Sequence, residues 1–320
     1  MIDLSTLAQF LVTYPGGAER VGIHEANGHA SESSGKIRLG DGCAAIANPS
    51  GNGHLLFSAA EMLESFVKED PWFAGYSTVM VNLSDIAAMG GRPAAITDIH
   101  WSPSEEISAL IWQGMQAAAR AHAVPIVGGH TTRTRFGNAN LGAAALGHAS
   151  DRLITSFDAK PGDHLVIAID MHGGYRGDHP FWDSSAATSH ERLQLDLEML
   201  PSLAEKGLCR AGKVIGSGGI IGTLAKLCQG SGVGAIFDLE NLPCPMNVEI
   251  ERWLVSTPSF GYLLAINPED LESTLSHFTA TRITCRDIGR FTDDPAIIIA
   301  ADGEFAAVDF GVVPALVGAL

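Results

Sequence analysis

The chain has 320 residues, of which 46% are hydrophobic and 18% charged, and its formal net charge is −16. This length favours two domains, the hydrophobic content excludes a disordered chain, and the acidic charge disfavours sequence-independent binding of nucleic acid or of an anionic membrane. Five scattered Cys without a CxxC pattern, and the absence of any signal-peptide or membrane-spanning pattern, predict a reduced, cytoplasmic protein.

The N-terminal third begins with an arm and a hairpin. Residues 1–36 open with a short amphipathic segment and continue in Gly, Ser, His and Glu, and we expect a flexible arm there. Residues 37–59 read as a β-hairpin, because two apolar runs flank a Pro-Ser-Gly-Asn-Gly turn. A helix is predicted between Pro71 and Gly91, where apolar residues recur at helical spacing and a Gly-Gly pair followed by a proline ends it.

The next elements are a strand, a helix and two strands. Residues 94–101 are predicted as a strand. The following helix is expected to have Ser102 as its N-cap, Pro103 as its first residue and Glu105 as the reciprocal cap, and to run to about His122. Two further strands are predicted at the end of this half of the chain, over residues 124–130 and 139–148.

The second half alternates helices with apolar strands. A turn at residues 160–163 precedes a buried strand, HLVIAID. Beyond it we expect helices at about 190–207, 219–231, 246–255 and 268–278 and strands at 234–238, 260–266, 282–290 and 296–301. Such alternation predicts α/β or α+β layers. We place the domain boundary around residues 150–160, which gives an N-terminal domain over 37–155 and a C-terminal domain over 156–320.

The most informative segment is VNLSDIAAMGGRP, residues 81–93. Asn82 and Asp85 are three residues apart on a predicted helix and therefore share a face, where a carboxylate beside an amide is a plausible ligand pair for a hard cation. From spacing alone, a solvated helix charge is the more common role of such an Asp.

This segment closely resembles the signature of thiamine-monophosphate kinase and of the wider superfamily that includes AIR synthetase, selenophosphate synthetase and the hydrogenase maturation protein E. Other segments resemble the remaining elements of the family in the same order along the chain. They are LGDGCAAI at 39–46, SAAEML at 58–63, GGHTT at 128–132, KPGD at 160–163 and GSGGIIGTL at 216–224. The resemblance covers roughly residues 35–300.

The resemblance implies an α+β fold of two AIR synthetase-like domains. In this family the N-terminal domains of two subunits pair their sheets into a shared β-barrel, so a homodimer is expected. It also implies that ATP and Mg2+ bind in a cleft to which the partner subunit contributes, and that the γ-phosphate passes to a small-molecule substrate. Carboxylates suit this chemistry because they recruit the metal that neutralises charge on the transferred group.

The metal ligands that the resemblance implies are Asp41, Glu61 and Asp85. Several acids of the family pattern are replaced in this chain. The family's usual acids are absent at Gly42, Val214 and Ser217, and Glu61 stands where the family has Asp. The remaining acidic set is sufficient for one or two metal ions.

The resemblance also implies the residues that contact nucleotide or substrate. His130, which stands where the kinases have Asp, and Arg133 are expected to contact phosphate or substrate as catalytic residues. The expected nucleotide-binding residues are Lys36, Asn82, Gly128, Gly129, Thr131, Gly218 and Gly219. From the residues alone, Lys36 and Arg133 are equally explained as solvated charges, and a glycine-rich helix start is by itself a weak signal for phosphate.

We therefore expect an ATP- and Mg2+-dependent enzyme that phosphorylates a small metabolite, or activates it through phosphorylation. The alternative is a non-catalytic, nucleotide-binding partner protein on the same scaffold, which the replaced acids at Val214 and Ser217 indicate. Asp98, His100 and Trp101 end a strand near the substrate side that the resemblance implies, so they are candidates for substrate contact. For His100 the residues favour a buried, hydrogen-bonded side chain instead.

Overall fold

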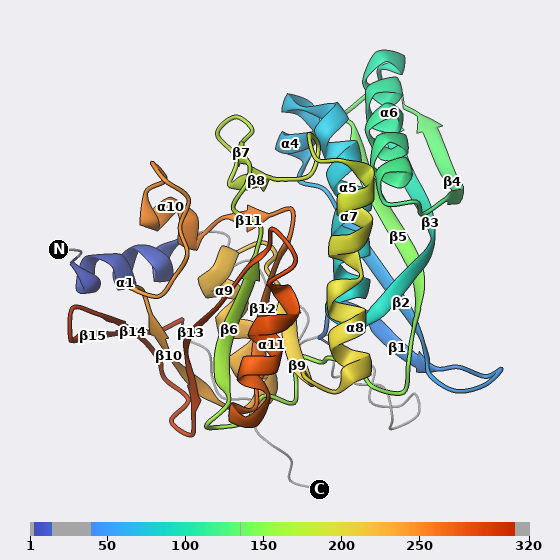
Figure 1. Ribbon diagram of the computed structural model, residues 1–320. Helices are drawn as coiled ribbons and strands as arrows, with labels where there is room; N and C mark the ends of the chain where they lie inside the picture. The colour runs from blue at the N-terminus through green and yellow to red at the C-terminus, as the bar shows by residue number, and fades with distance from the viewer. Residues whose placement is uncertain (1–2, 15–39, 135, 311–320) are drawn as a thin grey trace, which may run out of the picture. The chain divides into compact units, whose positions relative to one another are not determined.

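A computed structural model describes residues 3–14, 40–134 and 136–310 (Figure 1). Contacts group the chain into two compact units, and both units are discontinuous in sequence. Unit 2 comprises Gly42–Leu153 and Ser185–Glu205, and unit 1 comprises Met1–Asp41, Ile154–Ser184 and Lys206–Leu320. Each unit combines helices with a mixed sheet, so the predicted α+β class is confirmed.

Unit 2 is built on a five-stranded sheet in the order β1-β2-β5-β3-β4. Its strands are β1 (Ala44–Ala47), β2 (His54–Glu61), β3 (Gly91–Ser102), β4 (Ile126–Arg133) and β5 (Asn140–Ala149). Only β3 and β4 pair in parallel, and the other neighbours are antiparallel. The predicted hairpin is confirmed as β1 and β2, in which Ala44 lies opposite Phe57.

Two long helices cover one face of this sheet (Figure 1). They are α5 (Pro71–Ala88) and α6 (Glu105–Ala121), and the short α4 (Glu64–Glu69) precedes them. The side chain of Asp70 caps α5 by accepting a hydrogen bond from Phe73 N at 3.0 Å. The helix ends as predicted, because Gly90 adopts a φ of +77° that favours glycine.

The start of α6 differs from the prediction. Ser104, and not Ser102, is the N-cap, and its side chain accepts a hydrogen bond from Ile107 N. Ser102 is still part of β3, where it lies opposite Arg133 of β4. The strand pairing therefore holds Ser102 in extended backbone, and the helix begins at Glu105, two residues later than predicted.

The helix predicted over residues 190–207 is two helices, α7 (His190–Leu197) and α8 (Met199–Lys206). Pro201 lies in the first turn of α8, where its missing N–H is tolerated, whereas inside one long helix it would remove a hydrogen bond. Arg92 Nε of β3 donates to Glu198 Oε2 at 2.8 Å, and Arg92 also pairs with Glu205. These ion pairs attach Ser185–Glu205 to unit 2.

Unit 1 is built on a seven-stranded sheet in the order β15-β14-β10-β13-β6-β12-β9. Its strands are β6 (His164–Ile169), β9 (Ala211–Val214), β10 (Gly234–Asp238), β12 (Gly261–Ile266), β13 (Thr284–Thr292), β14 (Ile297–Ala301) and β15 (Glu304–Val308). A three-stranded sheet contains β7 (Gly174–Tyr175), β8 (Phe181–Asp183) and β11 (Thr257–Pro258). The helices are α1 (Leu4–Thr13), α9 (Gly219–Ser231), α10 (Ile250–Leu254), η1 (Pro268–Asp270) and α11 (Leu271–Phe278). Every residue of β6 and β12 is buried, so these two strands form the centre of the unit.

The beginning of the predicted flexible arm is a packed helix. Asp3 caps α1, and Leu4, Leu7 and Leu11 are buried in the core of unit 1. The amphipathic pattern of the first residues was the sequence signal for this helix. Residues 15–36 of the arm, which include Lys36, and residues 37–39 of the predicted hairpin lie outside the described residues.

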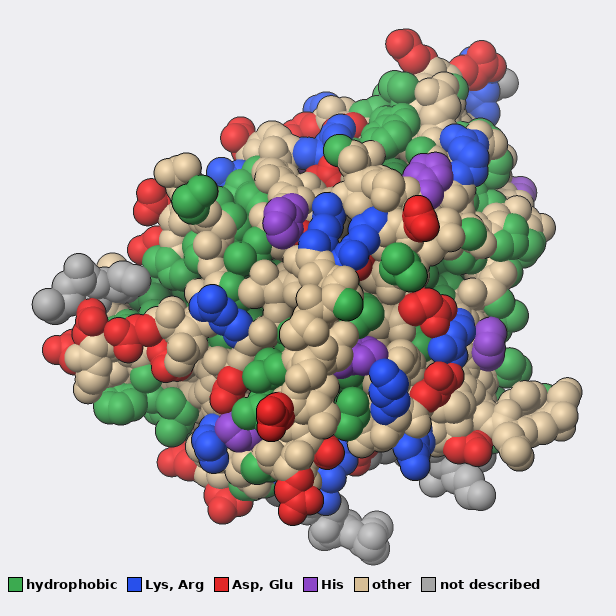
Figure 2. Space-filling view, in the orientation of Figure 1, with side chains coloured by type: hydrophobic (Ala, Val, Ile, Leu, Met, Phe, Trp, Pro, Cys, Tyr) green, Lys and Arg blue, Asp and Glu red, His purple; other side chains and the backbone are tan. Residues whose placement is uncertain are grey.

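On the face of the molecule drawn in Figure 2, neither acidic nor basic side chains predominate, and both kinds are interspersed with hydrophobic ones. Among the described helices, none is both long enough and apolar enough to cross a membrane.

Two thiols of unit 1 are chemically protected. Burial raises the pKa of Cys209 and of Cys228 to about 12. Because the thiolate is the reactive form, we predict that both cysteines resist iodoacetamide at neutral pH in the folded protein and react after unfolding in guanidinium. Peptide mass mapping measures this, with the half-buried Cys244 as an internal comparison. Rapid alkylation of Cys228 in the folded protein would contradict the structure.

Candidate functional site

The acid of the signature helix is anchored to the sheet of unit 2. Asp85 lies in the last turn of α5 and is half-buried, and its Oδ2 accepts a hydrogen bond from Ser58 Oγ of β2 at 3.0 Å. A Cβ atom at Gly42 would lie 3.1 Å from Asp85 Oδ1. A side chain at position 42, where the family described above has a second acid, would therefore begin beside Asp85. This arrangement fits a site where two carboxylates converge on a cation.

Asn82 occupies a different environment from Asp85. Its side chain is fully buried, and its Nδ2 donates to Thr78 O at 2.8 Å. Its Oδ1 has no hydrogen-bond partner among the described residues. Helical spacing brings Asn82 and Asp85 to neighbouring positions on α5, but only Asp85 is partly accessible. A contact between Asn82 and a nucleotide stays a prediction.

The other two predicted metal ligands have different surroundings. Asp41 belongs to unit 1, where its carboxylate accepts a hydrogen bond from Ser156 N at 2.7 Å and lies 3.6 Å from Lys213 Nζ. Glu61 is exposed at the end of β2, and strand alternation places it on the opposite face from Ser58. Within the described ranges, no three acidic, His or Cys side chains form a group that could hold a metal ion. The metal assignment therefore stays a prediction.

The GGHTT segment lies on β4, the edge strand of the sheet. Gly128, Gly129, His130 and Thr131 are all exposed there. A Cβ at Gly129 would lie only 1.9 Å from Asp98 Oδ1, so glycine is needed at this position for packing against β3. These residues are accessible to a ligand, and their predicted contacts with phosphate are not tested by the structure.

Arg133 is the last residue of β4, and its side chain already forms an ion pair with Glu105. Its Nη1 donates to Glu105 in the first turn of α6, and both side chains are well exposed. An exposed pair of this kind contributes less than about 1 kcal/mol, so Arg133 is able to exchange Glu105 for a phosphate.

The glycines at the start of α9 have a structural explanation. Gly218 and Gly219 both have a positive φ, 97° and 66°. A Cβ at Gly219 would lie 2.3 Å from the carbonyl carbon of Val255, so the backbone of α9 approaches that of α10 too closely for any side chain. The left-handed backbone accounts for Gly218 and packing accounts for Gly219, and a role in phosphate binding stays a prediction.

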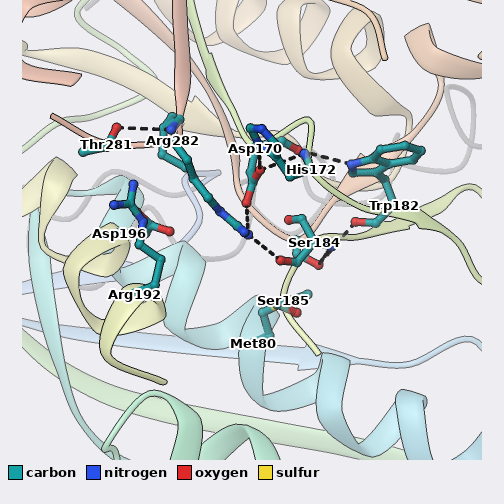
Figure 3. A network of polar contacts seen from close by, with 12 residues as sticks. Met80, Asp170, His172, Trp182, Ser184, Ser185, Arg192, Asp196, Thr281 and Arg282 are labelled. Carbon is teal, nitrogen blue, oxygen red and sulfur yellow. Dashed lines mark hydrogen bonds and ion pairs between the residues drawn. The ribbon is translucent and has the colours of Figure 1, made fainter. Parts of the chain in front are cut away.

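Sequence analysis missed a buried polar network in unit 1 (Figure 3). Asp170, which follows β6, is 1% exposed and accepts hydrogen bonds from Arg282 Nη2 and from His172 N. Arg282 Nη2 also donates to Ser184 O at 2.8 Å, and Trp182 Nε1 donates to Asp170 O. The Asp directly after the apolar run LVIAI was the available signal. Its partner is 112 residues away, and no local pattern indicates that distance.

Removing the cation from this network should destabilise the fold. We predict that Arg282→Ala lowers the free energy of unfolding by about 3–5 kcal/mol, because it leaves the Asp170 carboxylate buried without its partner. Denaturation in urea measures the loss. Arg286→Ala, which changes an exposed residue of the nearby β13, is the control and should cost less than about 0.5 kcal/mol. Equal losses in the two variants would contradict the assigned role of Arg282.

Comparison with known proteins identifies the family. The chain matches the AIR synthase related protein N-terminal domain over residues 40–149 and the C-terminal domain over residues 160–302. It belongs to the AIR synthase related protein family. The uncharacterized protein sll0787 of Synechocystis sp. is 48% identical over 245 residues, which are 76% of this chain and 75% of that protein. A thiamine-monophosphate kinase of Synechococcus elongatus is 28% identical over 287 residues, with 81% and 85% of the two chains covered.

Solved structures show the same fold. Thermotoga maritima PurL complexed with ATP superposes with a TM-score of 0.72 at 18% identity, over 84% of this chain and 46% of PurL, so the chain spans about half the length of that protein. AaThiL complexed with AMPPCP and TMP gives a TM-score of 0.67 at 16% identity, over 90% of this chain and 96% of AaThiL. These structures agree with the predicted two-domain fold, and the family-domain matches confirm the predicted superfamily.

Proposed function

We propose that this AIR synthase related protein is an ATP- and Mg2+-dependent enzyme that phosphorylates a small metabolite or activates it through phosphorylation. Both family domains are present, and the relatives include a thiamine-monophosphate kinase and a protein whose structure contains the ATP analogue AMPPCP. Within the chain, the proposal rests most directly on Asp85, a partly accessible carboxylate on the signature helix whose Oδ1 lies close to Gly42.

The chemistry of Asp85 suits magnesium. Mg2+ prefers oxygen ligands and usually keeps several waters, so a site in the protein needs only one or two carboxylates. Ser58 donates to Oδ2 of Asp85, which orients the carboxylate, and Oδ1 lies on the side of Gly42. We propose that Asp85 holds the metal, whereas Glu61 lies on the opposite face of β2 from Ser58 and is not assigned to the same ion. A bound Mg2+ supplies positive charge that stabilises the transferred phosphoryl group.

The first test is nucleotide binding by isothermal calorimetry with and without Mg2+. We expect binding of ATP that depends on Mg2+ and that weakens on the order of 10- to 100-fold in Asp85→Asn, because the metal loses its charged ligand. Glu106→Gln, which changes an exposed acid of α6, is the matched control and should bind as the original chain does. Absence of binding at millimolar ATP with Mg2+ would refute the proposal.

A gain-of-acid variant distinguishes an enzyme from a degenerate partner protein. Gly42→Asp would place a second carboxylate beside Asp85, and the backbone there is not in the glycine-only region. If the site holds Mg2+, this variant should need less Mg2+ for half-maximal ATP binding. Phosphate release from ATP is then measured with thiamine phosphate, aminoimidazole precursors and selenide. Turnover with any substrate in the unchanged protein excludes the non-catalytic alternative.

We also propose that a second copy of the chain covers the open face of the unit 2 sheet. Five large apolar side chains on that face are between 38% and 51% exposed, namely Ile46, Phe57, Ile99, Trp101 and Leu146. The strand register places them on one side, for example with Phe57 opposite Leu146, while α5 and α6 cover the other side. A contiguous exposed apolar patch marks an interaction surface, and the shared β-barrel of the family would cover it.

Oligomeric state tests this interface. We predict a dimer for the unchanged chain and a monomer for Phe57→Glu, because the change would bury an unpaired charge at the centre of the interface. Light scattering coupled to size-exclusion chromatography measures the mass. Phe305→Glu is the control, since Phe305 is 67% exposed on β15 of unit 1 and lies outside this face. A monomeric unchanged chain at micromolar concentration, or a dimeric Phe57→Glu variant, would contradict the proposed interface.

A further inference from the structure

Three side chains of unit 2 form a hydrogen-bonded series that the proposed nucleotide chemistry does not use. His100 of β3 is 2% exposed, and its Nδ1 lies 2.9 Å from Asp98 Oδ2 while its Nε2 lies 2.8 Å from Ser108 Oγ of α6. An ionised carboxylate only accepts hydrogen bonds, so Nδ1 carries the ring proton and Nε2 accepts from the Ser108 hydroxyl. This is the tautomer in which histidine is able to remove a proton from serine.

Ser108 and His100 line a cavity between α6 and β4. The cavity has a volume of about 630 Å³, and its apolar wall includes Trp112, Ile126 and Val127. This volume is within the range of small-molecule sites. Ser108 is partly exposed whereas His100 is buried, so the serine hydroxyl is the group that a ligand in the cavity would reach.

The backbone of β4 forms part of the cavity wall. Gly128 and Gly129 of this strand line the cavity. Because β4 is an edge strand, alternate N–H groups along it point away from β3. Such donors stabilise the oxyanion that forms when a nucleophile attacks a carbonyl. The contact of Gly129 with Asp98 leaves no room for a side chain, which keeps this wall open and holds the carboxylate in place.

We propose that Ser108, His100 and Asp98 form a second catalytic site that hydrolyses small, neutral carboxylic esters. The apolar wall suits a short acyl group. Glu105 lies at the same cavity but is ion-paired with Arg133, so it offers no uncompensated charge to an ionic substrate. Ser108 is the nucleophile, His100 the base, and Asp98 the positioning residue that fixes the tautomer.

The reaction proceeds in two balanced steps. Ser108 Oγ bonds to the acyl carbon as its proton passes to His100 Nε2, and the ester C–O bond breaks as that proton goes to the leaving alcohol. Water then attacks the acyl carbon and gives one proton to His100. The carboxylic acid leaves as the proton returns to Ser108 Oγ.

The test is covalent labelling of the folded, full-length chain with a fluorophosphonate, combined with hydrolysis of 4-nitrophenyl acetate. In the labelling reaction Ser108 Oγ bonds to phosphorus and fluoride leaves. We expect one adduct, mapped by mass spectrometry to Ser108, and ester turnover that is lost in Ser108→Ala. His100→Gln should slow labelling on the order of 100-fold or more, since it removes the base. Ser65→Ala, which changes an exposed serine of α4, is the matched control.

Each outcome decides the proposal. Absence of an adduct on Ser108, an adduct without ester turnover, or equal labelling of the unchanged and His100→Gln proteins would overturn it. The hydrogen bonds among Asp98, His100 and Ser108 would then have only the structural role of linking β3 to α6. Thermal melting establishes whether each variant is folded. If Ser108→Ala does not fold, Asp98→Asn provides a second test of ester turnover and labelling. None of these assays uses ATP or Asp85, so failure here is separable from failure of the proposed kinase-like function.

Discussion

The close crossing of α5 and α6 is the constraint on which both candidate sites of unit 2 depend. A Cβ at Gly75 would lie 2.1 Å from Ile111 O, and a Cβ at Gly114 would lie 1.8 Å from Trp72 O. The two backbones therefore touch, and only glycine fits at either position. This crossing fixes both helices on one face of the sheet, so that α5 brings Asp85 to Ser58 and α6 brings Ser108 to His100.

Elements with local signals could be predicted from the sequence. The limits of α9 and β10 match the prediction, and the end of α5 follows from Gly90. Errors occurred where a distant partner decides the local conformation. Ser102 has the sequence features of an N-cap, but its pairing with β4 keeps it in the strand, and Ser104 caps α6 instead. The grouping of Ser185–Glu205 with unit 2 likewise depends on distant partners, because α7 packs on α5 and α6 and Arg92 pairs with Glu198 and Glu205.

The same distinction between local signals and distant partners applies to the residues of the candidate sites. A motif within one helix identified Asp85, and helical spacing gave its position relative to Asn82 but not the complete burial of Asn82. The pairs Asp170–Arg282 and His100–Ser108 each join two different elements. Such pairs depend on the register and packing between elements, for which a single sequence contains no direct signal.

The proposed function depends on Asp85 binding the metal of a bound nucleotide. Crystals of the full-length chain grown with AMPPCP and Mn2+ test it most directly, because manganese is located by its anomalous scattering. We expect an anomalous peak about 2.2 Å from an Asp85 carboxylate oxygen, next to the phosphates of AMPPCP. Bound AMPPCP whose metal lies elsewhere, with Asp85 still hydrogen-bonded to Ser58, would contradict it.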